Sequence, residues 1–310
     1  LKRTGAPGGR RRPARARRGG MNTVLVSTLA VFTACLGSGS YVPLAPFLVE
    51  RSEVAWLLSA FGLASCLSLP AAGLAVDRFG PEWALQQGMA LYLLGLVLTS
   101  GSASFAAQLA GRVASGAASS MLFNAAMALI MKRFQEPARA LHLGTALGIG
   151  NVGSLVAPPL AGHAYIVASR LAWPEPQALA MLPSALTLLC SYAGLRSLPA
   201  AAEPAEEPLL KPPAAPDGLL RRFFGVYAAV GARSVVLAAA LACLFGAESA
   251  LLCAGALQMR GLGFSSAAIG WATVPAGVLQ VLFAHVGGSL STSPARQVAL
   301  MVAVPLLLAA

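Results

Sequence analysis

Eight apolar runs, each long enough to cross a lipid bilayer, dominate the chain, and a ninth begins near residue 297. A membrane-spanning helix needs about 20 mainly apolar residues. Backbone polar groups in lipid must be satisfied within helices or a closed barrel, and runs of this length exceed the ~10-residue alternating strands of a barrel. We therefore predict an all-α membrane protein whose spans cover residues 22–45, 54–75, 84–104, 107–131, 140–166, 176–195, 234–257 and 264–287.

The overall composition supports the same prediction without reference to any single run. Hydrophobic residues make up 57% of the chain and charged residues 11%, and the mean hydropathy is +0.71. A water-soluble domain carries about 25% charged residues. The lipid bilayer is therefore the expected surrounding of this chain.

Lysine and arginine accumulate on one predicted side of the membrane. Residues 1–20 carry eight of the 22 basic residues, and the segments predicted on the same side carry ten more, whereas the opposite loops carry three. Because basic residues are enriched in cytosolic loops, we predict an integral, multi-pass protein with a cytosolic N-terminus. The net charge of +11 lies in loops and not on one folded face, so it indicates topology and anionic lipid, and no nucleic-acid partner is expected.

Local composition divides the chain into four parts. Residues 1–21 form a basic segment that we expect to be non-native or disordered, with a cytosolic arm or an organelle transit peptide as alternatives. Residues 22–196 hold the first six runs, and residues 197–233 form a cytosolic linker whose proline, alanine and charge cannot bury a core. Residues 234–310 hold about three runs, so we predict a six-helix first half and an incomplete second half.

A short polar cluster separates the second apolar run from the third. It reads Gly-Leu-Ala-Val-Asp-Arg-Phe-Gly and contains four residues of interest: Gly73, Asp77, Arg78 and Gly80. The cluster resembles the loop signature of the major facilitator superfamily, Gly-x-Leu-x-Asp-Arg-x-Gly, although Ala75 replaces the leucine and Pro81 and Glu82 replace the usual basic pair. The resemblance implies the major facilitator fold and a conformational-switch loop in which the aspartate caps a helix and pairs with basic groups.

Two further stretches resemble motifs of the same superfamily. In the fourth run, the stretch from Arg112 to Gly116 is similar to an Arg-x-x-x-Gly element whose arginine faces the central cavity. In the fifth run, a stretch resembles the motif associated with proton-coupled antiporters, although Ala157 and Ala161 replace two glycines. Its residues are Gly144, Gly148, Gly153, Pro158, Pro159 and Gly162. Glycines let helices approach closely and prolines bend a helix where the halves would rock, with ordinary helix packing as the alternative.

Only two charged residues fall inside the predicted spans, Arg112 and Glu248. Charges in a membrane are costly, which makes both residues candidates for cavity or coupling roles. Apolar surroundings favour the protonated form of a carboxyl group, so Glu248 is a candidate for proton exchange. Vesicular amine and drug antiporters carry an acidic residue in the matching region, so the resemblance implies the same role. The alternatives are a solvated Glu248 and an Arg112 that only packs against polar groups.

The resemblance implies a secondary transporter that works by alternating access about a midplane site. We predict proton-coupled antiport of a small organic solute, with a small-molecule substrate and protons as partners. The first run offers Ser38, Ser40 and Tyr41 but no acidic residue that would pair with an ammonium group. An organic-anion or monocarboxylate symporter is therefore an alternative, which the stretch from Asp77 to Gly80 also resembles. Outside transport, the alternative is a non-transporting scaffold or a non-functional fragment.

Motifs of enzymes and metal sites are missing from the sequence. It contains no phosphate-binding loop, no nucleophile elbow and no His-Glu-x-x-His zinc motif. The five cysteines lack Cys-x-x-Cys spacing and lie in apolar runs, and the three histidines are far apart. We therefore expect no enzyme activity, no cofactor and no metal.

Overall fold

The computed structural model describes residues 14–102, 104–135, 138–198, 252–275 and 278 of the 310-residue chain. Within these ranges every regular element is a helix and there is no strand. The prediction of an all-α protein is therefore confirmed. Glu248 and most of the predicted linker and second half lie outside the described residues.

Six long helices follow one another in the first part of the chain, matching the first six predicted runs. They are α1 (Ala14–Ser40), α3 (Arg51–Phe79), α4 (Pro81–Ser100), α5 (Phe105–Arg133), α6 (Ala138–Arg170) and α7 (Pro176–Arg196), with a short α2 (Ala45–Leu48) between α1 and α3. Five helices in the described part of the chain are long and apolar enough to cross a membrane: residues Gly20–Ser40 of α1, and all of α3, α5, α6 and α7. The chain is thus built as a multi-pass membrane protein.

Helix boundaries follow local chemistry. α3 begins with a capping box in which Glu50 and Glu53 satisfy each other's backbone N–H groups. α3 ends and α4 begins at Gly80, whose φ of +85° suits glycine, and Pro81 occupies the first turn of α4. α1 begins at Ala14, so part of the basic segment that was expected to be non-native or disordered is helical.

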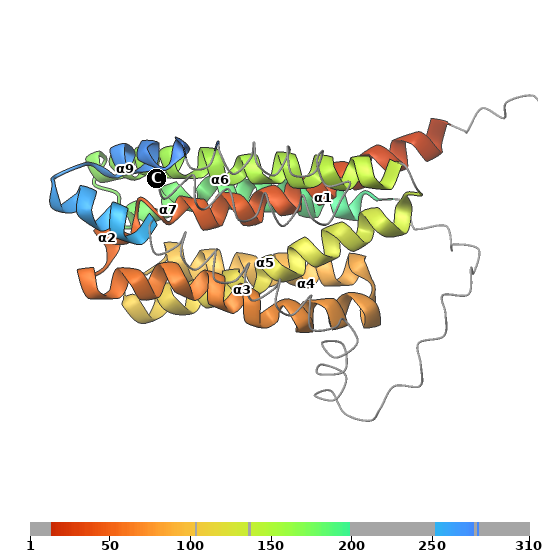
Figure 1. Ribbon diagram of the computed structural model, residues 1–310, viewed down its shortest axis with the longest axis horizontal. Helices are drawn as coiled ribbons and strands as arrows, with labels where there is room; N and C mark the ends of the chain where they lie inside the picture. The colour runs from red at the N-terminus through yellow and green to blue at the C-terminus, as the bar shows by residue number, and fades with distance from the viewer. Residues whose placement is uncertain (1–13, 103, 136–137, 199–251, 276–277, 279–310) are drawn as a thin grey trace, which may run out of the picture.

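The helices lie in two layers, with α1, α6, α7 and α9 (Ser266–Ala272) in one layer and α3, α4 and α5 in the other (Figure 1). α9 follows a helical segment, residues 252–261, and both belong to the predicted second half. We name the two ends of the bundle after residues found there. The Gly80 end holds the α3–α4 turn and the C-terminus of α5, and the Arg51 end holds the start of α3 and the C-termini of α1 and α6.

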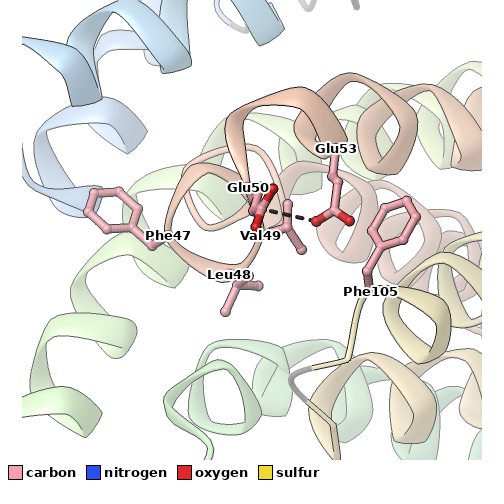
Figure 2. Close-up of a pocket in the computed structure, with 6 residues that line it drawn as sticks. All are labelled: Phe47, Leu48, Val49, Glu50, Glu53 and Phe105. Atoms are coloured by element: carbon pink, nitrogen blue, oxygen red, sulfur yellow. Dashed lines mark hydrogen bonds between the residues drawn. The ribbon is translucent and has the colours of Figure 1, made fainter.

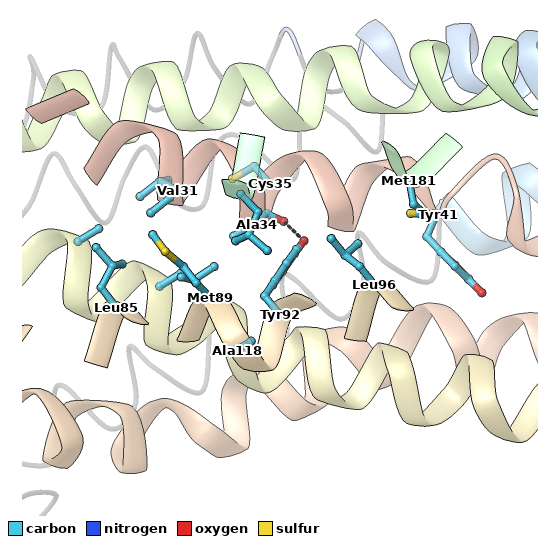
Figure 3. Close-up of a cluster of buried hydrophobic side chains, with 14 of the residues drawn as sticks. Val31, Ala34, Cys35, Tyr41, Leu85, Met89, Tyr92, Leu96, Ala118 and Met181 are labelled. Atoms are coloured by element: carbon cyan, nitrogen blue, oxygen red, sulfur yellow. Dashed lines mark hydrogen bonds between the residues drawn. The ribbon is translucent and has the colours of Figure 1, made fainter. Parts of the chain in front are cut away.

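The core of the first half lies where α1, α4 and α5 meet, and Tyr92 of α4 is at its centre (Figure 3). Tyr92 is fully buried, and its hydroxyl donates one hydrogen bond that is shared between the backbone oxygens of Thr33, at 3.2 Å, and Ala34, at 3.4 Å. Glycines bring α4 and α5 together, since a Cβ on Gly95 would lie 2.9 Å from the carbonyl oxygen of Gly111. Close packing through small residues is typical of helices in membranes, and here it fixes α5, which carries Arg112.

Candidate functional site

Arg112 is buried inside the first half and lies between two aromatic rings. Its side chain projects from α5, and the residue is only 4% exposed. The guanidinium carbon lies 4.7 Å from the ring centroid of Tyr41 and 4.6 Å from that of Phe61. Nε donates a hydrogen bond of 3.3 Å to the backbone oxygen of Leu57. Ring faces attract cations, so the two rings partly replace the water that this charge has lost.

Arg112 has no carboxylate partner in the described part of the chain. The ion pairs found there both involve Glu82, at the Gly80 end. A buried charge ordinarily needs a paired or hydrogen-bonded partner, because removal from water costs several kcal/mol. Among the described residues, Arg112 is therefore held by two rings and one backbone carbonyl and not by a countercharge.

Tyr41, the first residue after α1, completes the surroundings of this cation. It is 1% exposed, and its hydroxyl has no hydrogen-bond partner among the described residues. Buried polar groups are nearly always hydrogen-bonded, so an unpartnered hydroxyl beside an unpaired arginine indicates a polar site that is incomplete in this part of the chain. From the sequence, Tyr41 was noted only with Ser38 and Ser40 as what the first run offers in place of an acidic residue.

The spacing of Arg112 and Gly116 has a direct structural reason. A Cβ on Gly116 would collide with the carbonyl group of Phe61, so glycine is what allows α3 to pack so closely against α5. That approach places the ring of Phe61 over Arg112 and the carbonyl of Leu57 next to its Nε. Leu57 and Phe61 were not predicted as site residues. Their four-residue spacing on one helix face is the only sequence signal that could have indicated them.

The loop at the Gly80 end carries its charge contacts on a different residue from the one implied by the family resemblance. Glu82 lies 3.4 Å from Lys132 Nζ and 3.4 Å from Arg133 Nη2 at the end of α5. Asp77 is exposed, and in the described ranges it has neither an ion pair nor a capping hydrogen bond, while Arg78 lies over the ring of Phe79. The family signature has a basic residue near the position of Glu82, so this chain reverses the sign of the charge there.

The glycines and prolines of α6 serve two different interfaces. Gly153 faces α1, where a Cβ would lie 2.7 Å from the carbonyl oxygen of Phe32. Gly162 and Pro158 face α9, and a Cβ on Gly162 would collide with the carbonyl group of Ser266. Gly144 and Gly148 meet no atom within 4 Å among the residues described. The motif therefore joins the first half to itself at one level and to the second half at another.

Two shallow pockets lie at the Arg51 end, and neither contains Arg112. One of about 310 Å³ is lined by Phe47, Leu48, Val49, Glu50, Glu53 and Phe105 (Figure 2). The two glutamates already bond to the start of α3, and Figure 2 shows that contact as a dashed line. The other pocket, of about 330 Å³, lies between Phe47, Tyr165 and Ser265.

The long apolar helices define the class of this protein as a multi-pass helical membrane protein. Comparison with known proteins identifies its family. The family model of the Major Facilitator Superfamily matches residues 27–310. The chain therefore belongs to the Major Facilitator Superfamily, and the predicted family and fold are confirmed.

Curated relatives match part of the chain. The human vesicular acetylcholine transporter is 30% identical over 146 residues, which cover 46% of this chain and 27% of that protein. The vesicular acetylcholine transporter unc-17 of Caenorhabditis elegans is 30% identical over 125 residues, 40% of this chain and 24% of that protein. An uncharacterized MFS-type transporter of Mycobacterium tuberculosis is 30% identical over 133 residues, 42% of this chain and 22% of that protein. These matches span about a quarter of each relative's length.

Solved structures agree on the fold. A bacterial homologue of the human lysosomal transporter Spinster, in an inward-facing and unoccupied conformation, is similar with a TM-score of 0.61 at 19% identity, covering 90% of this chain and 63% of that one. Tetrameric PepTSo2 is similar with a TM-score of 0.50 at 16% identity, covering 93% of this chain and 57% of that one. Similarity at this level of identity concerns the arrangement of helices alone.

Proposed function

We propose that this chain is part of a proton-coupled antiporter of a small organic solute that works by alternating access. The observation that carries the proposal is the buried guanidinium of Arg112, held between Tyr41 and Phe61 without a carboxylate partner in the described residues. The similarity to vesicular acetylcholine transporters supports an organic solute. The candidate coupling group is Glu248, the acidic residue of the predicted seventh span, which lies outside the described residues.

The proposed coupling follows from charge pairing in an apolar site. An ionised Glu248 near Arg112 would be stabilised by the arginine, whereas a protonated Glu248 would leave the arginine unpaired. A solute that competes with the proton for the same carboxylate would then bind only after the proton leaves. Mutually exclusive occupancy of one group by proton and solute is the condition for antiport.

The basic residues support an orientation for this cycle. Lys132, Arg133 and Arg78 all lie at the Gly80 end, so the positive-inside rule places that end, and with it the N-terminus, in the cytosol. Cysteines placed singly at Ser197 and Ser102 would test this, because an impermeant thiol reagent added outside intact cells should label only the Ser102 position. Labelling of Ser197 alone would reverse the proposed topology.

The experiment that tests the function is proton flux in liposomes that contain the full-length protein, measured with a panel of organic cations and anions. The native protein, Glu248→Gln and Glu248→Asp would be compared across pH 5 to 8, together with direct solute binding. Solute-dependent proton flux that is lost in Glu248→Gln, retained in part by Glu248→Asp, and accompanied by intact binding supports the proposal. Unchanged flux in Glu248→Gln contradicts it, and absence of any flux favours a non-transporting scaffold.

A second candidate function, transport of an organic anion or monocarboxylate, is favoured by one observation. The ring of Tyr41 lies over Arg112, and in the described residues the Tyr41 hydroxyl has no hydrogen-bond partner and Arg112 has no carboxylate partner, so a bound carboxylate would supply a countercharge. In that case anion uptake would persist in Glu248→Gln and fall in Tyr41→Phe and Arg112→Gln. The same flux assay therefore separates the two functions by the variant that abolishes transport.

A further inference from the structure

α6 and α9 form a close contact between the two halves at the Arg51 end. Cβ atoms added to Gly162 or Gly270 would collide with the backbone of the opposite helix, so these helices touch along their main chains. The hydroxyl of Ser266, which is 2% exposed, donates a hydrogen bond of 3.0 Å to the carbonyl oxygen of Gly162. Close main-chain contact through small residues is typical of helices that pack in membranes.

One side-chain hydrogen bond lies at the margin of this contact. Trp271 Nε1 of α9 donates to His163 Nε2 of α6 at 3.0 Å. The two rings meet edge to face, with an interplanar angle of 76°. An indole nitrogen is a donor only, so this bond requires a lone pair on Nε2 and therefore an imidazole that is neutral, with its proton on Nδ1.

We propose that His163 and Trp271 form a proton-sensitive latch between the two halves. Protonation of His163 places a hydrogen on Nε2, which removes the acceptor and sets two N–H donors against each other. The edge of an aromatic ring is also its positive region, so the indole edge repels an imidazolium. Acidification at the Arg51 end therefore releases the latch and favours separation of α6 from α9.

The charged groups on the elements around the latch are few. In the described residues at this end, Arg170 lies in α6, Arg260 ahead of α9 and Glu175 ahead of α7, while Glu50, Arg51 and Glu53 lie at the start of α3. Glu175 bonds to Gln177, and Arg260 lies 4.3 Å from the ring centroid of Phe47. His163 lies about 10 Å from the end of α6, at 1.5 Å per helical residue, which places it near the Arg51 end.

The latch regulates the site that the proposed function describes, and in that sense it rests on the proposed function. A proton acting at His163 changes which end of the transporter opens, whereas a proton acting at Glu248 changes what the site binds. The two effects are separable, because the opening of α6 from α9 is measurable without solute and without transport.

The test is a distance measurement across this interface in the full-length protein in liposomes. A donor and acceptor pair would be attached to cysteines at Ser169 of α6 and Ser265 ahead of α9, which both line the second pocket, in a background without the native cysteines. As the pH falls from 8 to 5, the range in which histidines commonly titrate, the separated population should rise about two- to tenfold, the equilibrium effect of one hydrogen bond.

Three variants separate a latch from ordinary packing. Trp271→Phe removes the donor and keeps the ring, so it should raise the separated population at pH 8 and abolish the pH response. His163→Gln keeps an acceptor that does not titrate, so it should remain closed across the range. His142→Gln alters a histidine of the same helix at the Gly80 end, where it packs on Phe134, and should respond to pH as the native protein does.

A pH response that survives in both Trp271→Phe and His163→Gln would overturn the latch. So would a separated population that is constant with pH in the native protein. If the distance responds as proposed while proton flux is absent in every variant, the latch stands and the proposed function fails. If flux is present and the distance does not respond, the proposed function stands and the latch fails.

Discussion

The ion pairs of the Gly80 end and the buried cation toward the Arg51 end stabilise positive charge in different ways, although Arg78 at the Gly80 end also lies over a ring, that of Phe79. At the Gly80 end, Lys132 and Arg133 pair with Glu82 at 3.4 Å, and the side chains of Lys132 and Glu82 are 39% and 31% exposed. Toward the Arg51 end, Arg112 and Arg260 lie over aromatic rings, and Arg112 is almost fully buried. Exposed ion pairs are weak and are screened by salt, whereas contacts with ring faces gain strength when water is excluded.

This difference indicates which kinds of contact contribute to the free energy of unfolding of the first half. Contacts toward the Arg51 end depend on shape, because rings and glycines must lie close to their partners before a cation can be held there. Contacts at the Gly80 end depend on ionic strength and tolerate imperfect geometry. Substitutions that change shape should therefore have large effects near Arg112, and substitutions that change charge should have small effects near Glu82.

The largest effect is expected from Gly116→Val. The added side chain would collide with the carbonyl of Phe61 and force α3 away from α5, at a cost of about 3 kcal/mol in the free energy of unfolding. Thermal or denaturant unfolding in detergent measures it. The matched control is Gly144→Val, because no described atom lies within 4 Å of its Cβ. Equal destabilisation by both variants would show that close packing at Gly116 is unimportant.

The next largest effect is expected from Arg112→Lys. Lysine keeps the charge but lacks the planar group that contacts both rings while donating to Leu57. The transport rate should therefore fall about tenfold or more, which corresponds to a loss of about 1.4 kcal/mol of interaction free energy. The control is Arg196→Lys, which makes the same change at an exposed arginine at the end of α7. Initial uptake rates in liposomes provide the measurement, and full activity of Arg112→Lys would contradict a role for ring stacking.

A smaller effect is expected from Tyr41→Phe. This change removes a buried hydroxyl that has no partner among the described residues, so stability should stay level or rise by up to about 1 kcal/mol. The ring over Arg112 remains, so this variant isolates the hydroxyl from the cation–π contact. Calorimetric unfolding with and without a transported solute is the measurement. A loss of stability without solute would mean that the hydroxyl has a partner in the remaining part of the chain.

The smallest effect is expected from Glu82→Gln. Its ion pairs are partly exposed, so the free energy of unfolding should fall by less than about 1 kcal/mol, and the difference from the native protein should vanish near 1 M salt. Unfolding curves at low and high salt measure this. A loss that persists at high salt would show that Glu82 contributes through packing and that the proposed contrast between the two ends is wrong.

Much of the fold could be predicted from the sequence because helix formation in lipid depends on local apolar length. The six runs of the first half and the turn at Gly80 are set by residues close in the chain. The candidate site was harder to predict from the sequence. Arg112 was recognised as a charge inside an apolar run, but Phe61 and Leu57 lie about fifty residues away in the chain, and apolar residues of this kind are common in every span.

The ion pairs at the Gly80 end show that a sequence motif does not specify which charged residues pair in the structure. The resemblance assigned charge pairing to Asp77, whereas the structure places Glu82 beside Lys132 and Arg133. Glu82 occupies the first turn of α4, which the close packing of α4 on α5 brings against the end of α5. The partner of a surface charge depends on which helix ends meet, and that is decided by packing far from the charge.

By itself, the sequence determined that this chain crosses a membrane as helices and that it carries the motifs of one superfamily, because hydrophobic length and turn residues act locally. Only the tertiary structure decided which aromatic rings hold Arg112 and that His163 meets Trp271. These contacts join helices that are distant in the chain, and their distances depend on glycines that let main chains touch. Whether two side chains meet is a property of the packed bundle, and residue type and spacing along one chain leave it undetermined.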